Sequence, residues 1–134
     1  MSDIEQDSIE ENKSFQAALV TACIKRDSES IHQLCTQLEV NLPYLVLVLS
    51  ESLNELLTSG DYASGFYLLR QKIVSEVKDP YIDYTRVVVL LLMGDTDFAE
   101  QYLNASLNLY PQVQYLRDLR EAINEGIDPK LLIL

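Results

Sequence analysis

The sequence predicts an all-α fold, in which about three helical hairpins and a C-terminal capping helix stack into an α-solenoid. The main observation is a recurring turn, because Asp27, Asp61 and Asp95 are separated by two equal steps of 34 residues. A fixed period of about 20 to 50 residues is typical of stacked repeats. Apolar residues also follow helical spacing from Phe15 onward, and no stretch shows the strict alternation of a surface strand. Such an array presents a groove, so we expect a binding protein.

Seven helices are predicted from the residues that start and stop them. Gly60 and Gly94 can take the left-handed conformation that closes a helix, and the aspartates that follow can cap the next one. Pro43 suits a first helical turn, and Asp79-Pro80 forces a break because the residue before proline avoids the helical region. The predicted helices cover residues 13–25, 28–39, 43–60, 62–77, 81–93, 97–109 and 113–125.

The chain divides into a lead-in, a helical domain and a tail. Residues 1–12 are polar and acidic, and we expect them to be disordered. Ser8 and Glu11 offer an alternative, because they could form a capping box for an earlier helix start. The helical domain spans residues 13–126, and residues 127–134 form an apolar C-terminal tail.

The copies of the repeat fit the tetratricopeptide helix-turn-helix unit, whose length is also about 34 residues. In the third copy Gly94 opens the turn, Ala99 takes the small position and Pro111 closes the second helix. The second copy has Gly65 at the small position, whereas the first has Arg26 in place of the turn glycine. The register predicts core-facing side chains at Ile31, Cys35, Leu38, Leu69, Ile73, Ala99, Leu103, Ser106 and Leu107, and on the capping helix at Leu116, Leu119, Ala122 and Ile123.

Composition and charge narrow the classes of partner. A formal net charge of −11 argues against nucleic acids and anionic membrane surfaces, whose phosphates would be repelled. The longest uncharged apolar run, Val87 to Met93, is far shorter than the roughly 20 residues that span a bilayer. The acidic N-terminus resembles no secretion signal, so we expect a cytoplasmic protein. Cys23 and Cys35 are expected to be small buried thiols there, with a redox pair as the alternative.

The sequence offers no catalytic, cofactor-binding or metal-binding site, so we do not expect an enzyme. His32 is the only histidine, and it lies on a predicted polar helix face. The four glycines are scattered rather than gathered in a phosphate-binding loop.

Two helices are too apolar for a helix with one face in water. They contain the runs Leu42–Leu49 and Val87–Met93, and a helix that is apolar all round is normally buried. We expect an amphipathic helix to lie on them with its apolar side down. The alternative is that these runs fill the chain's own core. The repeat register places the following side chains towards the groove: Leu47, Leu57, Tyr81, Tyr84, Val88, Leu91 and Leu92.

The tail ends in four consecutive aliphatic residues, Leu131 to Leu134. A soluble chain rarely exposes such a patch without using it. The tail could fold back into the groove, dock a second subunit or pack against the capping helix. We favour the capping helix.

Three stretches resemble the small tetratricopeptide-type chaperone of bacterial type III secretion needles. They are Ser59-Gly60-Asp61-Tyr62-Ala63-Ser64, the Asp79-Pro80 break, and Tyr110-Pro111-Gln112-Val113-Gln114-Tyr115, and the similarity covers about residues 28–124. The resemblance implies a role in protein transport and virulence, in a complex with a small helical co-chaperone. The pair would hold the amphipathic C-terminal helix of the needle subunit and stop it polymerising early. Residues 1–12 and 131–134 extend beyond the family pattern.

Other readings of the groove remain open. One is the class II chaperone of type III translocator proteins, which binds extended segments. Another is a generic tetratricopeptide adaptor for a peptide C-terminus, which usually needs Lys and Arg to clamp the carboxylate, and the predicted groove offers almost none.

Overall fold

The chain forms an all-α array, as the sequence predicts. The computed structural model describes the backbone of residues 3–133 and the side chains of residues 10–133. Within that part of the chain every regular element is helical. The elements are α1 (Asp3–Lys25), α2 (Ser28–Leu38), α3 (Leu42–Thr58), α4 (Tyr62–Leu69), α5 (Lys72–Ser75), α6 (Pro80–Leu92), α7 (Thr96–Leu109), α8 (Gln114–Asn124) and the 3-10 helix η1 (Pro129–Leu132).

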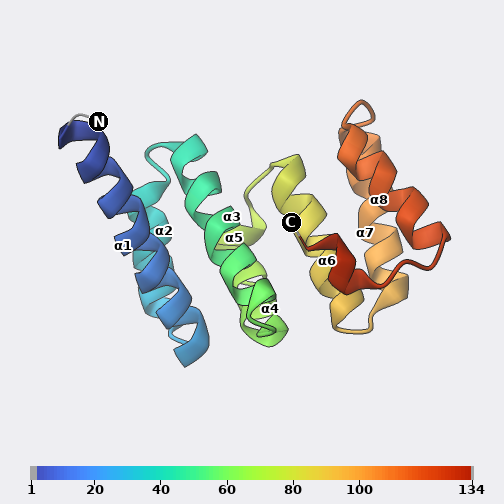
Figure 1. The fold of residues 1–134 in the computed structure, drawn as a ribbon, viewed down its shortest axis with the longest axis horizontal. Coiled ribbons are helices and arrows are strands. Elements are labelled where there is room, and N and C mark those ends of the chain that lie inside the picture. The colour runs from blue at the N-terminus through green and yellow to red at the C-terminus, as the bar shows by residue number, and fades with distance from the viewer. Residues whose placement is uncertain (1–2, 134) are drawn as a thin grey trace.

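The helices are arranged in two rows. In Figure 1, α1, α3, α6 and α8 follow one another along the molecule, and α2, α4 and α7 accompany them as the second helices of hairpins. Along the first row, α1 packs on α3, α3 on α6, and α6 on α8. The red C-terminal segment crosses in front of α6. The first helices therefore form one face of the array, and the tail lies on that face.

The recurring turn has the same geometry in all three copies. Arg26, Gly60 and Gly94 have φ values of 58°, 84° and 85°, which is the left-handed region. The residue after each of them donates its backbone N–H at 2.9 Å to a carbonyl five residues earlier, on Ala22, Leu56 and Leu90. The side chains of Asp27, Asp61 and Asp95 then accept from the N–H three residues later. The predicted caps are confirmed, and the first copy keeps the turn without glycine.

Contacts to the second hairpin hold Arg26 in this conformation, which costs a residue with a Cβ about 1–2 kcal/mol. Its guanidinium donates to Ser64 Oγ at 2.8 Å and lies over the Tyr67 ring, 5.1 Å from the centroid. Tyr67 in turn donates its hydroxyl proton to the Arg26 carbonyl at 3.1 Å. Arginine therefore replaces glycine where it also joins the first turn to α4.

A fourth turn of the same kind ends α8. Gly126 has a φ of 71°, and Ile127 donates its N–H to the Ala122 carbonyl at 3.1 Å. Asp128 follows and caps η1 through the Lys130 N–H. The capping helix thus ends like the first helix of another hairpin. After it, the chain turns back towards α6 instead of forming a long second helix.

The core consists of two connected clusters of buried side chains. One cluster is centred on α1 to α4 and the other on α6 to α8, and Phe66, Leu92 and Ile133 pack against both. Gly65 is buried where a Cβ would come within 3.3 Å of Leu57 Cδ2, which confirms it as a small position. Most predicted core residues are buried, namely Ile31, Cys35, Leu38, Leu69, Ala99, Leu103, Ser106, Leu116, Leu119 and Ala122. Ile73, Leu107 and Ile123 are partly buried.

The prediction of a disordered lead-in over residues 1–12 is wrong for the residues that the structure describes. α1 begins at Asp3, and Met1 and Ser2 lie outside the described residues. No glycine or proline precedes Lys25, so nothing in the sequence forces a later start. Acidic residues near a helix N-terminus are also favoured by the helix dipole.

The prediction of one helix over residues 62–77 is also wrong. α4 ends at Leu69, Gln71 has an extended conformation with ψ 136°, and α5 begins at Lys72. The break turns the Val74 carbonyl towards the buried guanidinium of Arg86, which donates to it at 2.6 Å. The break thus comes with a tertiary contact of α5, and no glycine or proline marks the position in the sequence.

Candidate partner-binding groove

A hollow between α3 and α6 brings together part of the set of residues predicted for the groove. Along α3 the lining side chains follow a helical stripe, and a second stripe on α6 faces it. These side chains, called the inner groove below, are Ser50, Asn54, Leu57, Tyr81, Tyr84, Thr85 and Val88. The structure thus brings together four of the seven predicted residues: Leu57, Tyr81, Tyr84 and Val88.

The other three predicted residues lie beyond the lined part of the inner groove. Leu47 is one turn before Ser50 on α3, and 42% of it is exposed. Leu91 and Leu92 are one turn after Val88 on α6, and they are partly buried against the core. The stripe on α3 therefore continues past the inner groove as an exposed apolar surface at Leu47.

The chain's own tail fills the inner groove. Leu132 and Ile133 line the same concavity, and the space left between them and the helices is only about 10 Å³. That is roughly the minimum that a single water needs. The tail is fixed by Tyr84, whose hydroxyl donates to the Leu132 carbonyl at 2.8 Å.

This position corrects the favoured prediction for the tail. η1 packs chiefly on α6 rather than on α8. The apolar stripe of α8, at Leu116, Leu119 and Ala122, is already buried within the array. The inner face of α6 still offers apolar side chains, so the tail covers those. Leu134, the last residue of the predicted tail, lies outside the described residues.

The alternative that the apolar runs fill the core is correct for most of α6. Val87 to Leu90 are buried all round the helix. Val88 lines the inner groove, and the tail contributes to its cover there. The run on α3 behaves differently, because Leu42 and Leu47 remain exposed while Leu45, Val48 and Leu49 are buried.

Aromatic rings form the rim of the inner groove towards α8. Tyr84 meets Tyr115 edge to face at 5.9 Å, and Tyr81 meets it at 6.5 Å. Burial raises the pKa of Tyr84, and the neighbouring Tyr81 raises it further. The Tyr84 hydroxyl therefore stays protonated near neutral pH and remains a donor.

One polar group of the inner groove is left unsatisfied. Ser50 Oγ is buried and has no hydrogen-bond partner among the described residues. An unpaired buried hydroxyl costs about 1–3 kcal/mol. The tail therefore fills the apolar space without satisfying every group that lines it.

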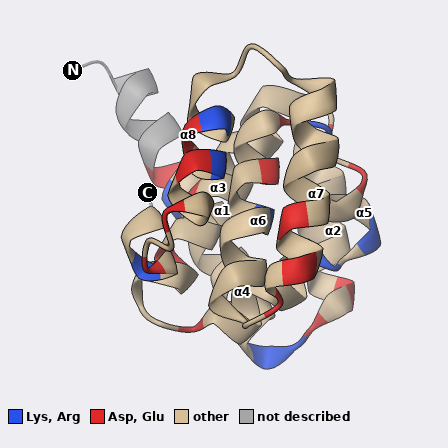
Figure 2. Cartoon of the chain, turned by 90° about the vertical axis from the view of Figure 1, so that its right-hand side faces the viewer, with Lys and Arg blue, Asp and Glu red and all other residues tan. Residues whose placement is uncertain are grey.

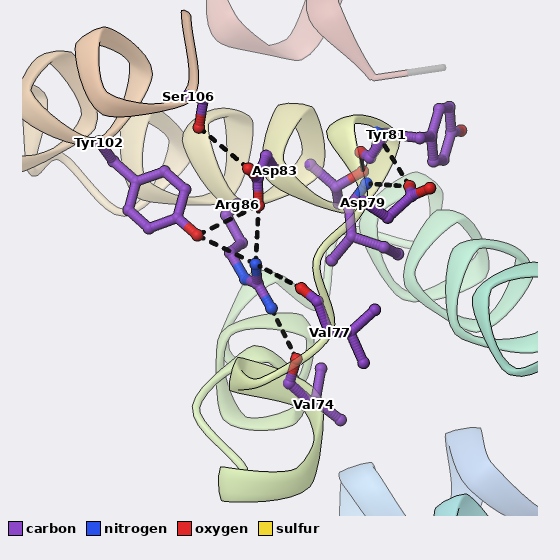
Figure 3. A network of polar contacts seen from close by, with 10 residues as sticks. Val74, Val77, Asp79, Tyr81, Asp83, Arg86, Tyr102 and Ser106 are labelled. Carbon is purple, nitrogen blue, oxygen red and sulfur yellow. Dashed lines mark hydrogen bonds and ion pairs between the residues drawn. The ribbon is translucent and has the colours of Figure 1, made fainter. Parts of the chain in front are cut away.

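A buried polar network, which the sequence analysis missed, holds the opposite side of α6 (Figure 3). Asp83 and Arg86 form an ion pair at 2.8 Å with side chains 8% and 9% exposed. Tyr102 and Ser106 of α7 both donate to the Asp83 carboxylate, at 3.2 and 3.1 Å. Arg86 also donates to Tyr102 and to the Val74 carbonyl. The available signal was an Asp and an Arg three residues apart in an otherwise apolar helix.

The network joins α6 to its neighbours on the side away from the inner groove. The Asp83 carboxylate faces one cation and two hydroxyl donors, so its charge is neutralised where it lies. The same contacts tie α6 to α7 and α5. Tyr84 and Val88 lie on the other side of the same helix and line the inner groove.

A second hollow lies on the network side of α6. It has a volume of about 260 Å³, and its lining is mostly apolar. Phe66, Leu90 and Phe98 contribute to it, and Phe98 is 52% exposed. No part of the described chain fills this hollow in the way that Leu132 and Ile133 fill the inner groove.

The charged side chains of α3, which forms one wall of the inner groove, are acidic. α3 carries Glu51 and Glu55 and no basic residue. On the second row, the only charged side chains of α7 are Asp97 and Glu100, and Figure 2 shows them as acidic bands on that helix. A partner with basic residues beside its apolar face would match this surface.

His32, Cys23 and Cys35 are the remaining candidates from the sequence, and they lie on α1 and α2. His32 is exposed on α2, and the described residues contain no group of three potential metal ligands. Cys23 and Cys35 are free and buried, and burial raises the pKa of both thiols to about 12. Among the described helices none is both long and apolar enough to cross a bilayer.

Comparisons of the chain with family models, with curated proteins and with solved structures find no match.

Proposed function

We propose that this protein is a cytoplasmic, non-enzymatic chaperone that binds an amphipathic helix on the inner face of its helical array. By its resemblance to needle chaperones of type III secretion, the ligand would be the C-terminal helix of a needle subunit. A small helical co-chaperone would complete the complex. Covering the apolar side of the helix would keep the subunit from polymerising before export.

One observation carries the proposal: the inner groove holds an apolar segment. Leu132 and Ile133 lie against α3 and α6, and a main-chain carbonyl of that segment is hydrogen-bonded to Tyr84. An inner face that accepts two aliphatic side chains of its own chain can accept those of another. Leu47 extends the apolar surface beyond the tail.

The chemistry of the ligand follows from the lining. Apolar side chains at regular helical spacing would lie along the stripe of α3. Basic residues beside them would meet Glu51 and Glu55. No Lys or Arg lines the inner groove, so a carboxylate clamp of the generic adaptor type has no support there.

One observation favours the class II translocator chaperone as a second candidate. The tail is bound through a 3-10 turn and an extended residue, since Ile133 has φ −71° and ψ 125°. A hydrogen bond to a main-chain carbonyl suits an extended segment, whose carbonyls are free, better than the middle of an α-helix. An extended translocator segment would therefore also fit the end of the groove near Tyr84.

Co-expression tests the proposal and separates its two forms. The chain would be produced with a needle subunit and its co-chaperone, and in parallel with a translocator segment. A monodisperse complex with the needle pair supports the first form, and a complex with the translocator segment alone supports the second. A chain that remains a stable monomer with both sets of partners contradicts the proposal.

A further inference from the structure

We propose that the C-terminal tail is a resident ligand of the inner groove, which the partner must displace in order to bind. This inference rests on the proposed function, because it assigns a competitor to the same site. It also specifies the partner segment: two adjacent aliphatic side chains with a main-chain carbonyl positioned for Tyr84.

The tail is bound by contacts that are not special to this chain. Leu132 and Ile133 supply aliphatic side chains, and Leu132 supplies a main-chain carbonyl to Tyr84 at 2.8 Å. Any segment with two neighbouring aliphatic residues can offer the same groups. The tail therefore occupies the groove in the way that a peptide ligand would.

The tail also covers the groove incompletely. Leu131, the first aliphatic residue of the terminal run, is 77% exposed. Ser50 Oγ beneath the tail lacks a hydrogen-bond partner among the described residues. Beside Ile133 an open hollow of about 380 Å³ runs between Leu57 and Lys130. A longer partner segment can fill this space and offer Ser50 a partner, so it can compete successfully with the tail.

The connection to the tail allows it to leave without unfolding the array. α8 ends at Asn124, and residues 125–128 are exposed. Gly126 already has a positive φ of 71°, which glycine takes without steric cost. Rotation in this linker would move η1 away from α6 while α8 keeps its contacts with α7.

The exposed end of the stripe gives a partner a place to start. From Leu47 to Leu57 the stripe on α3 spans about 15 Å at the rise of an α-helix. The tail covers the Leu57 end, whereas Leu47 is accessible. A partner helix can therefore contact Leu47 first and replace the tail afterwards.

Displacement has a defined effect on affinity. A site that is open in only a fraction of molecules binds with its intrinsic dissociation constant divided by that fraction. A tail that closes the groove in nine of ten molecules weakens binding about tenfold. Freeing the tail should strengthen binding by at least that factor.

The test uses the full-length chain and a labelled synthetic peptide with the sequence of residues 127–134. The variant Leu132→Ser/Ile133→Ser removes both groove-filling side chains, and Leu131→Ser is the matched control because Leu131 is exposed. We expect the peptide to bind the double variant at least tenfold more tightly than it binds wild type or the control. Equal binding to all three proteins would overturn the inference.

A second variant covers the case in which the double variant unfolds, as judged by circular dichroism. Tyr84→Phe keeps the ring and removes only the donor to Leu132. The peptide would itself use this donor, so the effect is measured on the chain's own tail: trypsin cleavage after the exposed Lys130 should be faster than in wild type, and an unchanged cleavage rate would overturn the inference.

The needle-subunit helix is tested on the same proteins. Peptide binding without helix binding supports the resident tail and contradicts the proposed function. If the needle-subunit helix binds all variants with equal affinity, the proposed function is supported and the resident tail is contradicted.

Discussion

The hydroxyl of Tyr84 donates a 2.8 Å hydrogen bond to the main-chain carbonyl of Leu132, 48 residues further along the chain. This bond joins the middle of α6 to the tail, on the face that the repeat register assigns to ligand binding. It is the one side-chain hydrogen bond between the tail and the array within the described residues. The state of the groove therefore depends on an interaction that a single substitution can remove.

Tyr84→Phe should release the tail in a fraction of the molecules. Loss of a neutral hydrogen bond typically costs about 1 kcal/mol. Lys130 is exposed and lies within the tail, so trypsin cleavage after it reports tail release. We expect faster cleavage at Lys130 in the variant. Tyr67→Phe loses an equivalent hydroxyl at the first turn and should leave this cleavage rate unchanged.

Leu47→Asp should abolish partner binding without unfolding the protein. Leu47 is 42% exposed on the open end of the α3 stripe, and a carboxylate there would lie in the apolar contact. Phe98→Asp is the matched control, because Phe98 is 52% exposed on the other side of α6. Pull-down with the partner helix should fail only for Leu47→Asp. Equal binding by both variants would show that the inner groove is not the binding site. Loss of binding in Phe98→Asp alone would indicate that the partner binds the second hollow.

Val88→Asp is unsuitable for the same purpose. Only 1% of Val88 is exposed, so a carboxylate there would destabilise the array itself.

Asp83→Ala should destabilise the protein strongly. The substitution leaves the buried Arg86 guanidinium without its counter-charge, and breaking a buried ion pair from one side costs about 3–5 kcal/mol. Urea denaturation gives the change in the free energy of unfolding. The double variant Asp83→Ala/Arg86→Met should recover part of the loss, because no unpaired charge remains. A loss below about 1 kcal/mol in the single variant would mean that the network does not hold α6.

The two substitutions Arg26→Gly and Arg26→Ala separate backbone strain from side-chain contacts. Both remove the bond to Ser64 Oγ and the contact with the Tyr67 ring. Alanine retains the cost of a φ of 58°, whereas glycine does not. We expect Arg26→Ala to be less stable than Arg26→Gly by about 1 kcal/mol in thermal or urea unfolding. Equal stability of the two variants would show that alanine does not keep the strained left-handed φ at this position.

The buried thiols should make the protein sensitive to alkali. Burial raises the pKa of Cys23 and Cys35 to about 12, whereas an exposed thiol titrates at about 8.5. The native state therefore retains protons that the unfolded state has lost. The contribution of the thiols to the free energy of unfolding should be fully present below about pH 8.5, and it should be lost as pH rises towards 12. A Cys23→Ala/Cys35→Ala variant should show a shallower fall in urea-denaturation curves, and an identical fall would assign the effect to the tyrosines.

The parts of the fold that could be predicted depend on local signals. Each aspartate at 27, 61 and 95 caps the helix that follows it, and glycine at 60 and 94 closes the helix before it. These contacts join residues that are close in the sequence, so they can be predicted from the residue types alone. Burial of Ala99 and Leu103 likewise follows from helical spacing.

The parts that could not be predicted depend on contacts between distant residues. The break after Leu69 accompanies the contact of Arg86 with the Val74 carbonyl, and neither Arg70 nor Gln71 is a helix breaker. The repeat register placed Tyr81, Tyr84 and Val88 on the side of α6 that lines the inner groove, but it could not locate the tail that fills the groove. The tail could have packed on the apolar face of α6 or on that of α8. Helical periodicity identifies both faces but does not show which one the tail covers.

The most direct test follows the methyl signals of Leu47, Leu57, Leu132 and Ile133 by NMR while the full-length chain is saturated with the partner helix. Binding in the inner groove predicts that the signals of Leu47 and Leu57 shift. It also predicts that those of Leu132 and Ile133 move to the positions of a free tail. A saturated complex in which Leu132 and Ile133 keep their free-protein signals would contradict the account.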